Sequence, residues 1–444
     1  MFENELVLLE EKKFSQLKTI LAELNPADIA LFMEEVPEES LAKVFRILPK
    51  DLAAETFSFV EPDLQELLIH SFSDSELKAV IDELYVDDAV DVIEEMPANV
   101  VKRILRSADA DKRKMINQIL KYPEDSAGSI MTIEYVSLRR KMTVKEALRR
   151  IRKTGLDKET IYTCYVTNDH NKLVGIITAK ALLLADEEDI IGDIMEDNPI
   201  YAVTTDDKED VANTLHKYDF LALPVVDDDR RLVGIVTVDD AMDVLQEEAT
   251  EDIEKMAAIL PGDKPYLKTS AFELFKSRVP WLLLLMLSAS FTTMIIRSFE
   301  NALAAHVILT SFIPMLMGTG GNSGSQASVT IIRGLSLGEI EFADTLKILW
   351  KETRVAILCG LTLAVASFFK VIWLDGATVT VSLVVSLTIL LTILTAKVTG
   401  CLLPVLASKL GFDPAVMANP FITTIVDALS LVIYFNIAGT IIGL

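Results

Sequence analysis

Cysteine and histidine are scarce in this sequence, and their scatter excludes several kinds of site. The three cysteines lie far apart and no Cys-x-x-Cys motif occurs (Cys164, Cys359 and Cys401). Neither a disulfide framework nor a thiolate zinc site is therefore expected. The four histidines are equally dispersed (His70, His170, His216 and His306).

Positive charge is also in short supply. The chain carries a net charge of −24, and residues 271–444 contain ten Lys/Arg against nine Asp/Glu, so residues 1–270 carry −25. A surface this acidic repels nucleic acid and anionic lipid and attracts cations. The alternative is that the acids only keep the protein soluble. The opening residues lack a basic start and an apolar core, so no signal peptide is expected and the acidic part should stay in the cytoplasm.

Prolines at regular spacing divide residues 1–130. Pro26, Pro37, Pro49 and Pro62 are 11, 12 and 13 residues apart, and Pro97 follows 35 residues later. Each stands where a helix is expected to begin, because a missing N–H costs nothing there. The runs between them indicate amphipathic helices of two to three turns, which bury their apolar faces by stacking. We expect an all-α superhelical N domain over residues 1–130.

A second repeat lies within residues 131–245. Residues 173–178, Leu-Val-Gly-Ile-Ile-Thr, recur as 232–237, Leu-Val-Gly-Ile-Val-Thr, at an offset of 59. Each copy follows a helical pattern and a β-rich run (144–151 and 161–166; 211–216 and 221–226). This resembles a tandem pair of CBS domains, which are β-α-β-β-α units whose paired sheets often hold a nucleotide. The two modules are expected over residues 131–192 and 193–245.

Residues 246–270 are expected to connect this pair to an apolar region. A helix is predicted over residues 241–260, where apolar side chains recur at steps of three and four (Met242, Leu245, Ala249, Ile253, Met256 and Leu260). The other faces are rich in acids. They form either a solvated surface or the cation-sensing face of a helix that joins a regulatory part to the membrane.

Residues 271–444 contain apolar segments long enough to span hydrocarbon, and we predict an all-α bundle of five spanning helices (279–298, 303–332, 354–374, 378–407 and 414–443). Seven Lys/Arg flank the ends on the N-terminal side of the membrane, and only Arg297 and Lys370 flank the others. The positive-inside rule then predicts a plasma-membrane protein with a cytoplasmic N-terminus and an external C-terminus. One five-helix bundle leaves little room for a pore, so a two-fold homodimer with the pore on its axis is the economical arrangement.

Residues 318–330 interrupt the second segment with four glycines and no charge (Gly-Thr-Gly-Gly-Asn-Ser-Gly-Ser-Gln-Ala-Ser-Val-Thr). An irregular backbone at membrane depth survives only where it is buried in protein or lines a wet cavity. We therefore expect irregular structure here, in a membrane part that carries something polar.

Two polar stripes are predicted on the spanning helices. Asn322, Gln326 and Thr330 follow one another at four-residue steps, and the fifth segment has a similar row (Asn419, Thr423, Asp427 and Ser430). Helix–helix hydrogen bonding is an alternative reason for the amides and hydroxyls. An ionised carboxylate at this depth is costly unless it meets a cation or water, so Asp427 favours the passage of a cation.

On a dimer axis Asp427 would face its own copy, and two carboxylates without a cation repel each other. Mg²⁺ keeps several waters while one or two carboxylates hold it, whereas Ca²⁺ prefers six to eight direct oxygens. No thiolate or imidazole lies nearby to favour zinc or copper. The residues therefore favour hydrated Mg²⁺ and leave Mn²⁺ and Co²⁺ open. An intramembrane enzyme is disfavoured, because no second acid, histidine or nucleophile shares the face of Asp427.

Over essentially its whole length the chain resembles the MgtE-type magnesium channel family. The order of helical N domain, CBS pair, connecting helix and spanning helices matches, and so do five motifs (residues 314–326, 413–420, 426–427, 234–240 and 249–252). The resemblance implies a homodimeric, Mg²⁺-selective channel whose pore lies between the second and fifth helices of both subunits. Asp427 would be the central pore carboxylate, with Asn322 and Asn419 beside the pathway; the polar stripes add Gln326 and Thr423.

The resemblance also implies that cytosolic Mg²⁺, bound between the N domain, the CBS pair and the connecting helix, shuts the pore. The positions that match the family's sensor acids are Glu55, Asp87, Asp91, Asp207, Glu209, Asp219, Asp240, Asp243, Glu248, Glu251 and Asp252. ATP is a further candidate ligand, because a Ser/Thr-x-x-Asp in CBS units holds ribose and phosphate. Thr237 and Asp240 match that pattern, but after Thr178 the aspartate is replaced by Ala181, which argues against ATP at the first half.

The sequence thus predicts a magnesium channel and not an enzyme, with two alternatives. One is a transporter or exporter of Co²⁺ or Mn²⁺. The other is a membrane receptor whose CBS pair senses adenine nucleotides without transport. Lys397, inside the fourth segment, fits none of them; we expect it to pack away from the pore axis or to pair with a carbonyl.

Overall fold

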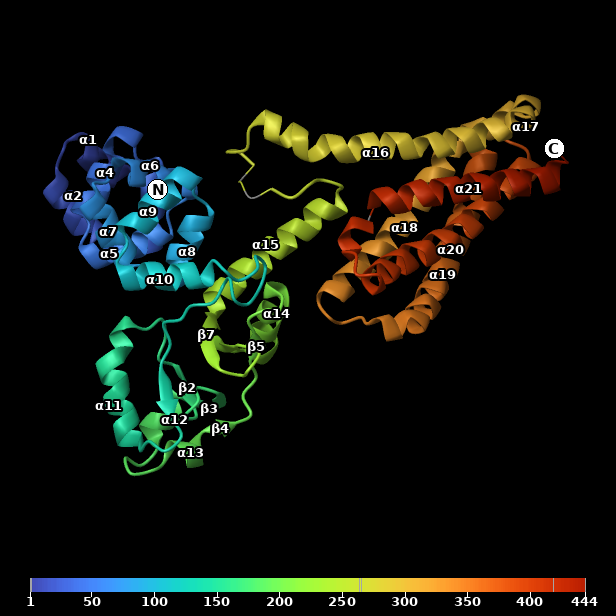
Figure 1. The fold of residues 1–444 in the computed structure, drawn as a ribbon. Coiled ribbons are helices and arrows are strands. Elements are labelled where there is room, and N and C mark those ends of the chain that lie inside the picture. The colour runs from blue at the N-terminus through green and yellow to red at the C-terminus, as the bar shows by residue number, and fades with distance from the viewer. Residues whose placement is uncertain (1, 263, 265, 418, 444) are drawn as a thin grey trace. The chain divides into compact units, whose positions relative to one another are not determined.

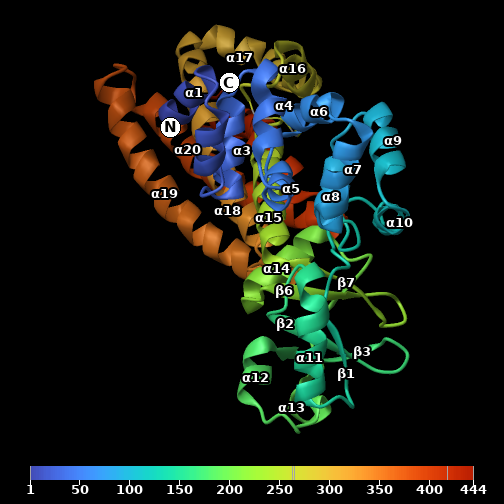
Figure 2. The same ribbon diagram turned by 90° about the vertical axis from the view of Figure 1, so that its left-hand side faces the viewer.

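The computed structural model describes residues 2–262, 264, 266–417 and 419–443, without the side chains of residues 301, 302, 305, 417 and 419. The chain divides into two compact units, Met1–Leu245 and Gln246–Leu444. Figures 1 and 2 show both units from two sides.

Short helices fill the N domain, and five of the ten described begin at the predicted prolines. They are α1 Glu3–Glu10, α2 Phe14–Leu21, α3 Pro26–Glu35, α4 Glu38–Ile47, α5 Lys50–Ser58, α6 Pro62–Ser71, α7 Asp74–Glu83, α8 Val86–Glu94, α9 Ala98–Ser107 and α10 Ala110–Ile119. Pro26 and Pro62 are the first residues of α3 and α6, and Pro37, Pro49 and Pro97 directly precede α4, α5 and α9. The proline pattern is confirmed.

The helices of the N domain stack on their second neighbours along the chain. α3 packs on α5, α5 on α7 and α7 on α9, while α4 packs on α6. Their apolar residues form one continuous core, with Phe32, Phe57 and Leu68 fully buried. This repeated stacking confirms the predicted superhelical arrangement.

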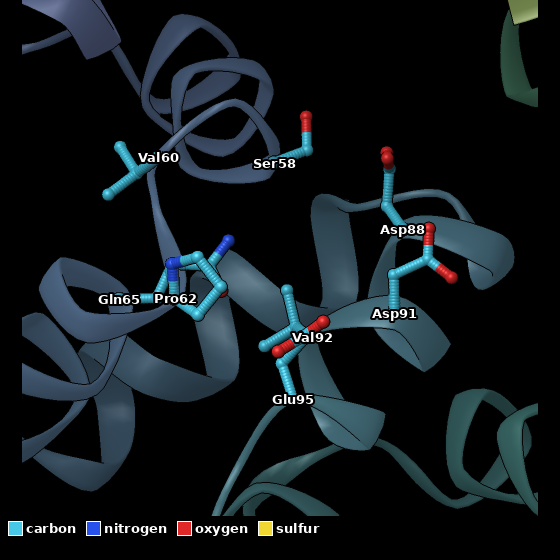
Figure 3. A pocket seen from close by; sticks show the side chains of 8 residues that line it. All are labelled: Ser58, Val60, Pro62, Gln65, Asp88, Asp91, Val92 and Glu95. Carbon is cyan, nitrogen blue, oxygen red and sulfur yellow. The ribbon is translucent and has the colours of Figure 1, made fainter. Parts of the chain in front are cut away.

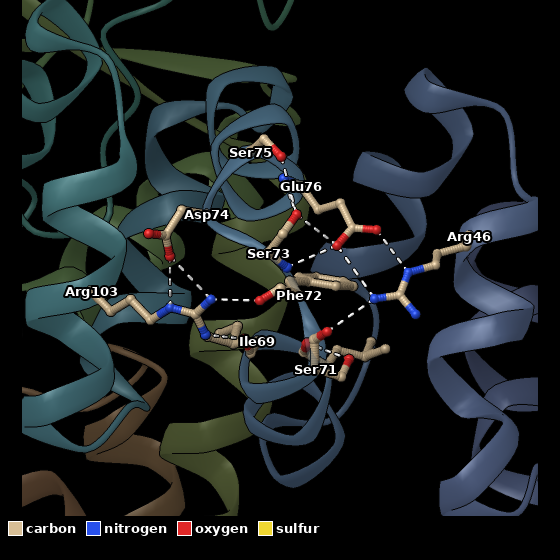
Figure 4. Close-up of polar contacts among 10 residues, drawn as sticks. Arg46, Ile69, Ser71, Phe72, Ser73, Asp74, Ser75, Glu76 and Arg103 are labelled. Atoms are coloured by element: carbon tan, nitrogen blue, oxygen red, sulfur yellow. Dashed lines mark hydrogen bonds and ion pairs between the residues drawn. The ribbon is translucent and has the colours of Figure 1, made fainter.

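Arginines join successive turns of this stack (Figure 4). Arg46 of α4 donates to the Glu76 carboxylate at 2.7 Å and to the backbone oxygen of Ser71 at 2.9 Å. Arg103 of α9 donates to Asp74 at 3.3 Å and to the carbonyl of Phe72. Side chains of α4 and α9 therefore meet at the start of α7 and tie these helices together.

Two small sheets follow, one in each predicted CBS module. The first module contains β1 Ser137–Arg139, α11 Val144–Thr154, β2 Thr163–Thr167, β3 Leu173–Thr178 and α12 Ala179–Leu184, and α13 Ile191–Ile194 crosses its predicted end. The second contains β4 Glu196–Asp197, β5 Ala202–Val203, α14 Lys208–Tyr218, β6 Ala222–Val226 and β7 Leu232–Thr237. The strand orders are β1-β2-β3-β4 and β5-β6-β7, with the first pair of each sheet parallel and the others antiparallel. The repeat at an offset of 59 is confirmed as the hairpin strands β3 and β7.

A segment of each predicted module pairs with the sheet of the other. Glu196, which lies beyond the predicted boundary at residue 192, pairs with Ile176 of β3. Thr132, at the start of the first predicted module, forms an isolated bridge with Ile235 of β7. A Cβ on Gly175 would lie 2.8 Å from the Glu196 carbonyl oxygen, and one on Gly234 would lie 2.8 Å from that of Thr132. The repeated glycine is therefore needed where these segments approach.

Helix α15, Val238–Met256, begins directly after β7. The helix predicted over residues 241–260 is thus confirmed, but its predicted end is wrong, because Ala258 adopts a left-handed conformation with φ of 54°. The predicted apolar stripe is also not the buried face. Met242 and Ile253 are exposed, whereas Ala241 and Val244 are buried.

Long helices make up the second unit after α15. They are α16 Ala271–Ser298, α17 Glu300–Ala305, α18 Ile313–Ser336, α19 Thr345–Trp373, α20 Val379–Lys409 and α21 Asn419–Ile442, with short 3-10 turns at Val307–Phe312, Phe342–Asp344 and Pro414–Met417. Within the described residues, four segments are long and apolar enough to cross a membrane: Ala271–Ser298, Phe342–Trp373, Val379–Lys409 and Pro420–Ile442. Figure 1 shows α18, α20 and α21 side by side, with α16 along α21.

The expectation of irregular structure at residues 318–330 is wrong, because α18 runs through them without a break. Gly320 and Gly324 are buried against α20 and α21, and a Cβ on Gly320 would lie 2.8 Å from the Ser430 hydroxyl oxygen. A Cβ on Gly400 of α20 would run into the carbonyl oxygen of Gly324. Glycine is costly in a helix exposed to water, but here it lets three helices approach closely, as small residues do within membranes.

Lys397 pairs with a carboxylate and not with a carbonyl. Its Nζ lies 3.3 Å from Oε2 of Glu352 on α19, and the lysine is only 5% exposed. The expected carbonyl partner is therefore wrong, and packing away from the pore axis stays a prediction.

Candidate functional site

Asp427 lies where α21 meets the glycines of α18. A Cβ on Gly321 would be 3.1 Å from Cγ2 of Thr423 and 3.9 Å from Oδ1 of Asp427. Thr423 donates its hydroxyl to the carbonyl of Pro420 at 3.0 Å, which leaves Asp427 beside the bare backbone of α18. Among the described residues, no hydrogen bond or ion pair reaches the Asp427 carboxylate. Glycine at residue 321 thus keeps open the space in front of this acid.

The predicted polar stripe on α18 lies on an uncovered face of the protomer. Asn322, Gln326 and Thr330 are all exposed, and they follow Gly321 along the helix. In the other stripe, Thr423 and Asp427 are partly buried, but Ser430 is fully buried and donates to the carbonyl of Val426 at 2.6 Å. Ser430 therefore belongs to the packing of the bundle. The side chain of Asn419 lies outside the described part of the chain.

A cluster of carboxyl groups forms between α8 and the start of α15. Asp87 is 7% exposed, and among the acids whose charges raise its pKa, Asp240 has the largest effect. The negative charges of Asp88, Glu159 and Asp239 also raise pKa values within this group of acids. The structure thus brings together the predicted sensor acids Asp87 and Asp240 and three acids that were not predicted. Lys112 is the cation at the edge of this cluster, and it donates to the carbonyl of Leu84 and lies 3.5 Å from Glu134.

The crowding makes the charged state of these acids costly. Burial, followed by the repulsion of Asp240 and Asp88, raises the pKa of Asp87 well above its usual range. Burial raises the pKa of Asp240 to about 7, although the hydroxyl of Thr237 opposes the change with a 2.6 Å hydrogen bond. Burial together with Asp88, Asp239 and Asp240 raises the pKa of Glu159 to about 8. A proton or a cation would stabilise this cluster.

Asp91 lines a separate cavity in the N domain (Figure 3). The cavity, of about 140 Å³, also contains Asp88 and Glu95 of α8, Ser58 of α5 and Gln65 of α6 among its lining residues. Figure 3 shows Asp88 and Asp91 on one side and Gln65 on the other. A space of this size holds several waters at about 30 Å³ each. Burial, followed by the charges of Glu159, Glu134 and Glu55, raises the pKa of Tyr85. Glu55 of α5 therefore lies near the start of α8.

The remaining predicted sensor acids are not gathered at one point of the protomer. Asp207 and Asp219 bound the two ends of α14, and Asp207 accepts from the backbone N–H of Glu209 at 2.8 Å. A helix of eleven residues is about 16 Å long, so one ion cannot bridge these ends. The other four follow one another along α15 (Asp243, Glu248, Glu251 and Asp252). Within the described residues, no three Asp, Glu, His or Cys side chains stand at metal-ligand geometry.

The candidate nucleotide residues are engaged locally. Thr178 accepts from the N–H of Ala181 at 3.2 Å and caps α12. Thr237 donates to Asp240, which at the same time belongs to the carboxyl cluster. A ribose at the second half would therefore compete with that cluster for Asp240.

Comparison with known proteins decides which class of protein carries these features. A family described as a divalent cation transporter matches residues 313–437, the MgtE intracellular N domain matches 24–125, and CBS domains match 127–188 and 191–247. The magnesium transporter MgtE of Thermus thermophilus is 37% identical over 97% of this chain and 96% of its own length. The chain belongs to the MgtE family. A second MgtE, from Bacillus subtilis, is 34% identical over 98% of this chain and 96% of its own.

Solved structures agree with the MgtE assignment of the soluble part. The cytosolic domain of the Mg²⁺ channel MgtE in complex with ATP is 37% identical, with a TM-score of 0.51 over 53% of this chain and 96% of that domain. The soluble part of a magnesium transporter is 31% identical, with a TM-score of 0.53 over 56% of this chain and 98% of that structure. The predicted fold class is confirmed: a helical N domain, tandem CBS domains and a helical membrane part. The family consists of magnesium transporters, not enzymes.

Three acids of the carboxyl cluster were not predicted from the sequence. Asp88 and Asp239 are direct neighbours of the predicted Asp87 and Asp240, so the two Asp-Asp pairs are a signal that could have been used. Glu159 had no such signal. It reaches the cluster because its backbone N–H donates to the carbonyl of Glu134 at 2.9 Å, a tertiary contact that no local pattern encodes.

Proposed function

We propose that this MgtE-family chain forms a homodimeric, Mg²⁺-selective channel of the plasma membrane. The observation that carries the proposal is the half-buried Asp427 beside Gly321, next to the exposed amides of Asn322 and Gln326. A second copy covering this face would bring two such carboxylates together in a polar surrounding. Two carboxylates that leave the waters of a Mg²⁺ ion in place suit its reluctance to dehydrate.

The N-terminal unit is proposed to be cytoplasmic and the C-terminus external. Basic residues at the ends of the apolar segments support this orientation by the positive-inside rule. The proposed domains are the N domain (1–130), the CBS modules (131–192 and 193–245), the connecting region (246–270) and the membrane domain (271–444).

Cytosolic Mg²⁺ is proposed to close the pore through the acidic residues of the first unit and of α15. The support is the carboxyl cluster around Asp87 and Asp240, where burial and mutual repulsion make a bound cation favourable. When Mg²⁺ leaves, the repulsion pushes the N domain and the CBS pair apart, and α15 carries the change onward. The other proposed sensor positions are Glu55, Asp91, Asp207, Glu209, Asp219, Asp243, Glu248, Glu251 and Asp252.

ATP is a proposed secondary ligand of the second CBS half, through Thr237 and Asp240. The related cytosolic domain solved in complex with ATP supports it. At the first half Thr178 stands without an aspartate, so we propose no nucleotide there. A Co²⁺ or Mn²⁺ transporter is the second candidate function, because oxygen ligands accept these ions too.

Liposome flux measurements test the pore. Asp427→Asn keeps the size of the side chain and removes its charge, and we expect Mg²⁺ uptake to fall at least about tenfold, since a carboxylate contributes at least about 1.4 kcal/mol to holding a divalent ion. Asp375→Asn is the matched control, because Asp375 is an aspartate at the end of α19 that pairs with Lys370 at 2.7 Å, away from the polar face. Undiminished uptake by Asp427→Asn would remove the support for this pore.

Co-expression of two differently tagged chains tests whether two copies share one pore. Mixed dimers of one wild-type chain and one Asp427→Asn chain, isolated through both tags and reconstituted in liposomes, should lose most of their uptake if both carboxylates face one ion. If each protomer conducts alone, the mixed dimers would keep about half of the wild-type flux, and the homodimeric pore would be wrong.

A further inference from the structure

The last turns of α15 are attached to the two helices that carry the candidate pore residues. Asp252 accepts a 3.0 Å hydrogen bond from the hydroxyl of Ser336, the last residue of α18. Met256 packs on Ile332 of α18 and on Ala415, which lies in the turn before α21. The end of the connecting helix therefore contacts both sides of the proposed pathway.

Lys255 makes the charged part of this attachment. Its Nζ lies 2.7 Å from Oδ2 of Asp413 and 2.6 Å from Oε1 of Glu251, one turn earlier on α15. The other carboxylate oxygen of Asp413 accepts the N–H of Ala415 at 2.7 Å. Asp413 thus links the lysine directly to the turn that leads into α21 and Asp427.

The lysine occupies a position that a divalent cation would otherwise suit. Glu251 and Asp413 both reach one point within hydrogen-bonding distance, and Lys255 fills that point with a single fixed charge. Burial alone would lower the pKa of Lys255, but its hydrogen bonds to Asp413 and Glu251 outweigh burial and raise the pKa above its usual value. The ammonium group therefore stays charged at physiological pH. Glu251, a predicted sensor acid, thus already shares one cation of the chain with Asp413.

We infer that Lys255 is a positioning residue of the gate: a built-in positive charge that holds α15 against α18 and the entry to α21 without Mg²⁺. The inference deepens the proposed gating and rests on it. With Lys255 present, the closed arrangement needs bound Mg²⁺ only to offset the acids elsewhere. Without it, Glu251 and Asp413 repel each other when α15 docks, and more Mg²⁺ is required to close the pore.

The experiment is a titration of cytosolic-side Mg²⁺ against channel current, with the full chain in excised membrane patches. Lys255→Met removes the charge and keeps the length of the side chain. We expect its half-inhibitory Mg²⁺ concentration to rise about three- to tenfold, as for the loss of a partly buried ion pair. Asp413→Asn should raise the half-inhibitory concentration similarly, because it removes the negative partner of Lys255. Its amide oxygen can still accept the N–H of Ala415, so the turn before α21 is kept. If the two residues act through one contact, the half-inhibitory Mg²⁺ concentration of the double variant should be no higher than that of either single variant.

The matched control is Lys264→Met. Lys264 lies between α15 and α16, where it forms an exposed pair with Glu273 of α16 at 3.5 Å. Its half-inhibitory concentration should remain that of the wild type.

A second readout does not depend on current. Ser336→Cys, in a Cys359→Ser background, can be labelled with a water-soluble maleimide in the absence of Mg²⁺. Labelling should become several-fold faster when Lys255→Met is added, because α15 no longer stays on the end of α18.

The outcomes separate the inference from the function beneath it. If the wild type is not inhibited by cytosolic Mg²⁺, the proposed gating is wrong, and faster labelling of Ser336→Cys would still support the attachment by Lys255. If the wild type is inhibited while Lys255→Met changes neither the titration nor the labelling, the inference is overturned and the gating stands. A lower half-inhibitory concentration in Lys255→Met would also overturn it.

Discussion

Replacing Asp240 with asparagine should strengthen the contact between the N domain and the CBS pair when Mg²⁺ is absent. Asp240→Asn keeps the shape of the side chain, and its amide can still bond with Thr237, which now donates to the carboxylate at 2.6 Å. What disappears is one negative charge from the cluster that contains Asp87, Asp88 and Asp239. A local loss of charge is thus expected to stabilise the docked arrangement.

The size of the effect follows from the pKa of Asp240. Burial raises it to about 7 from an ordinary value near 4, which corresponds to a cost of up to about 4 kcal/mol for the charged form in the docked arrangement. A carboxyl group with a raised pKa leaves the docked arrangement fully stable below pH of about 4, and the stability falls as pH rises towards 7. The benefit of Asp240→Asn should therefore be greatest above pH 7 and nearly absent below about pH 4.

Hydrogen exchange of the full-length protein in detergent measures this contact through the amides of α8. At pH 8 without Mg²⁺, we expect slower exchange in Asp240→Asn than in the wild type, after correction for the intrinsic effect of pH. Adding Mg²⁺ should slow exchange strongly in the wild type and less in the variant. Asp228→Asn is the control, because Asp228 is an exposed acid of the same module, in the turn between β6 and β7. Faster exchange in Asp240→Asn at pH 8 would refute the argument from repulsion.

Two further predictions concern the membrane helices. Gly400→Ala should prevent normal packing of α20 on α18, because the added Cβ meets the backbone oxygen of Gly324, which cannot move away. We expect a loss of stability of about 1–3 kcal/mol or more, measured by thermal unfolding in detergent. Gly318→Ala, with open space around it, should leave the unfolding temperature unchanged. Lys397→Met should destabilise by about 3–5 kcal/mol, because Glu352 is left as an unpaired buried charge. The double variant with Glu352→Met should recover most of that loss, and a double variant as unstable as Lys397→Met would show that the ion pair is not the cause.

Local patterns predicted the parts of the fold that repeat. Prolines such as Pro26 and Pro62 mark helix starts because their effect is confined to one turn, and the copies of Leu-Val-Gly-Ile became hairpin strands because alternation and turn residues act over a few positions. The need for the two glycines within these copies was not visible in the sequence. It comes from segments that arrive from the neighbouring module.

The polar face of the membrane part was predicted, but its backbone was not. Spacing alone placed Asn322 and Gln326 on one side of α18, and the structure agrees. Reading the glycines of residues 318–330 as breaks failed, because helix propensity measured against water does not apply where neighbouring helices fill the space. The partners of Lys397 and Lys255, which are Glu352 and Asp413, are distant in the chain, so no local signal could identify them.

The backbone pairing between the two CBS modules has a mechanical consequence. To part, the modules would have to peel Glu196 from β3 and Thr132 from β7, breaking main-chain hydrogen bonds at both places. We therefore expect the two modules to move as one body, and β7 leads directly into α15, which starts at the very next residue. Under the proposed gating, such a body would amplify motion: a small shift at an ion site on its edge would become a larger displacement along a helix of nineteen residues.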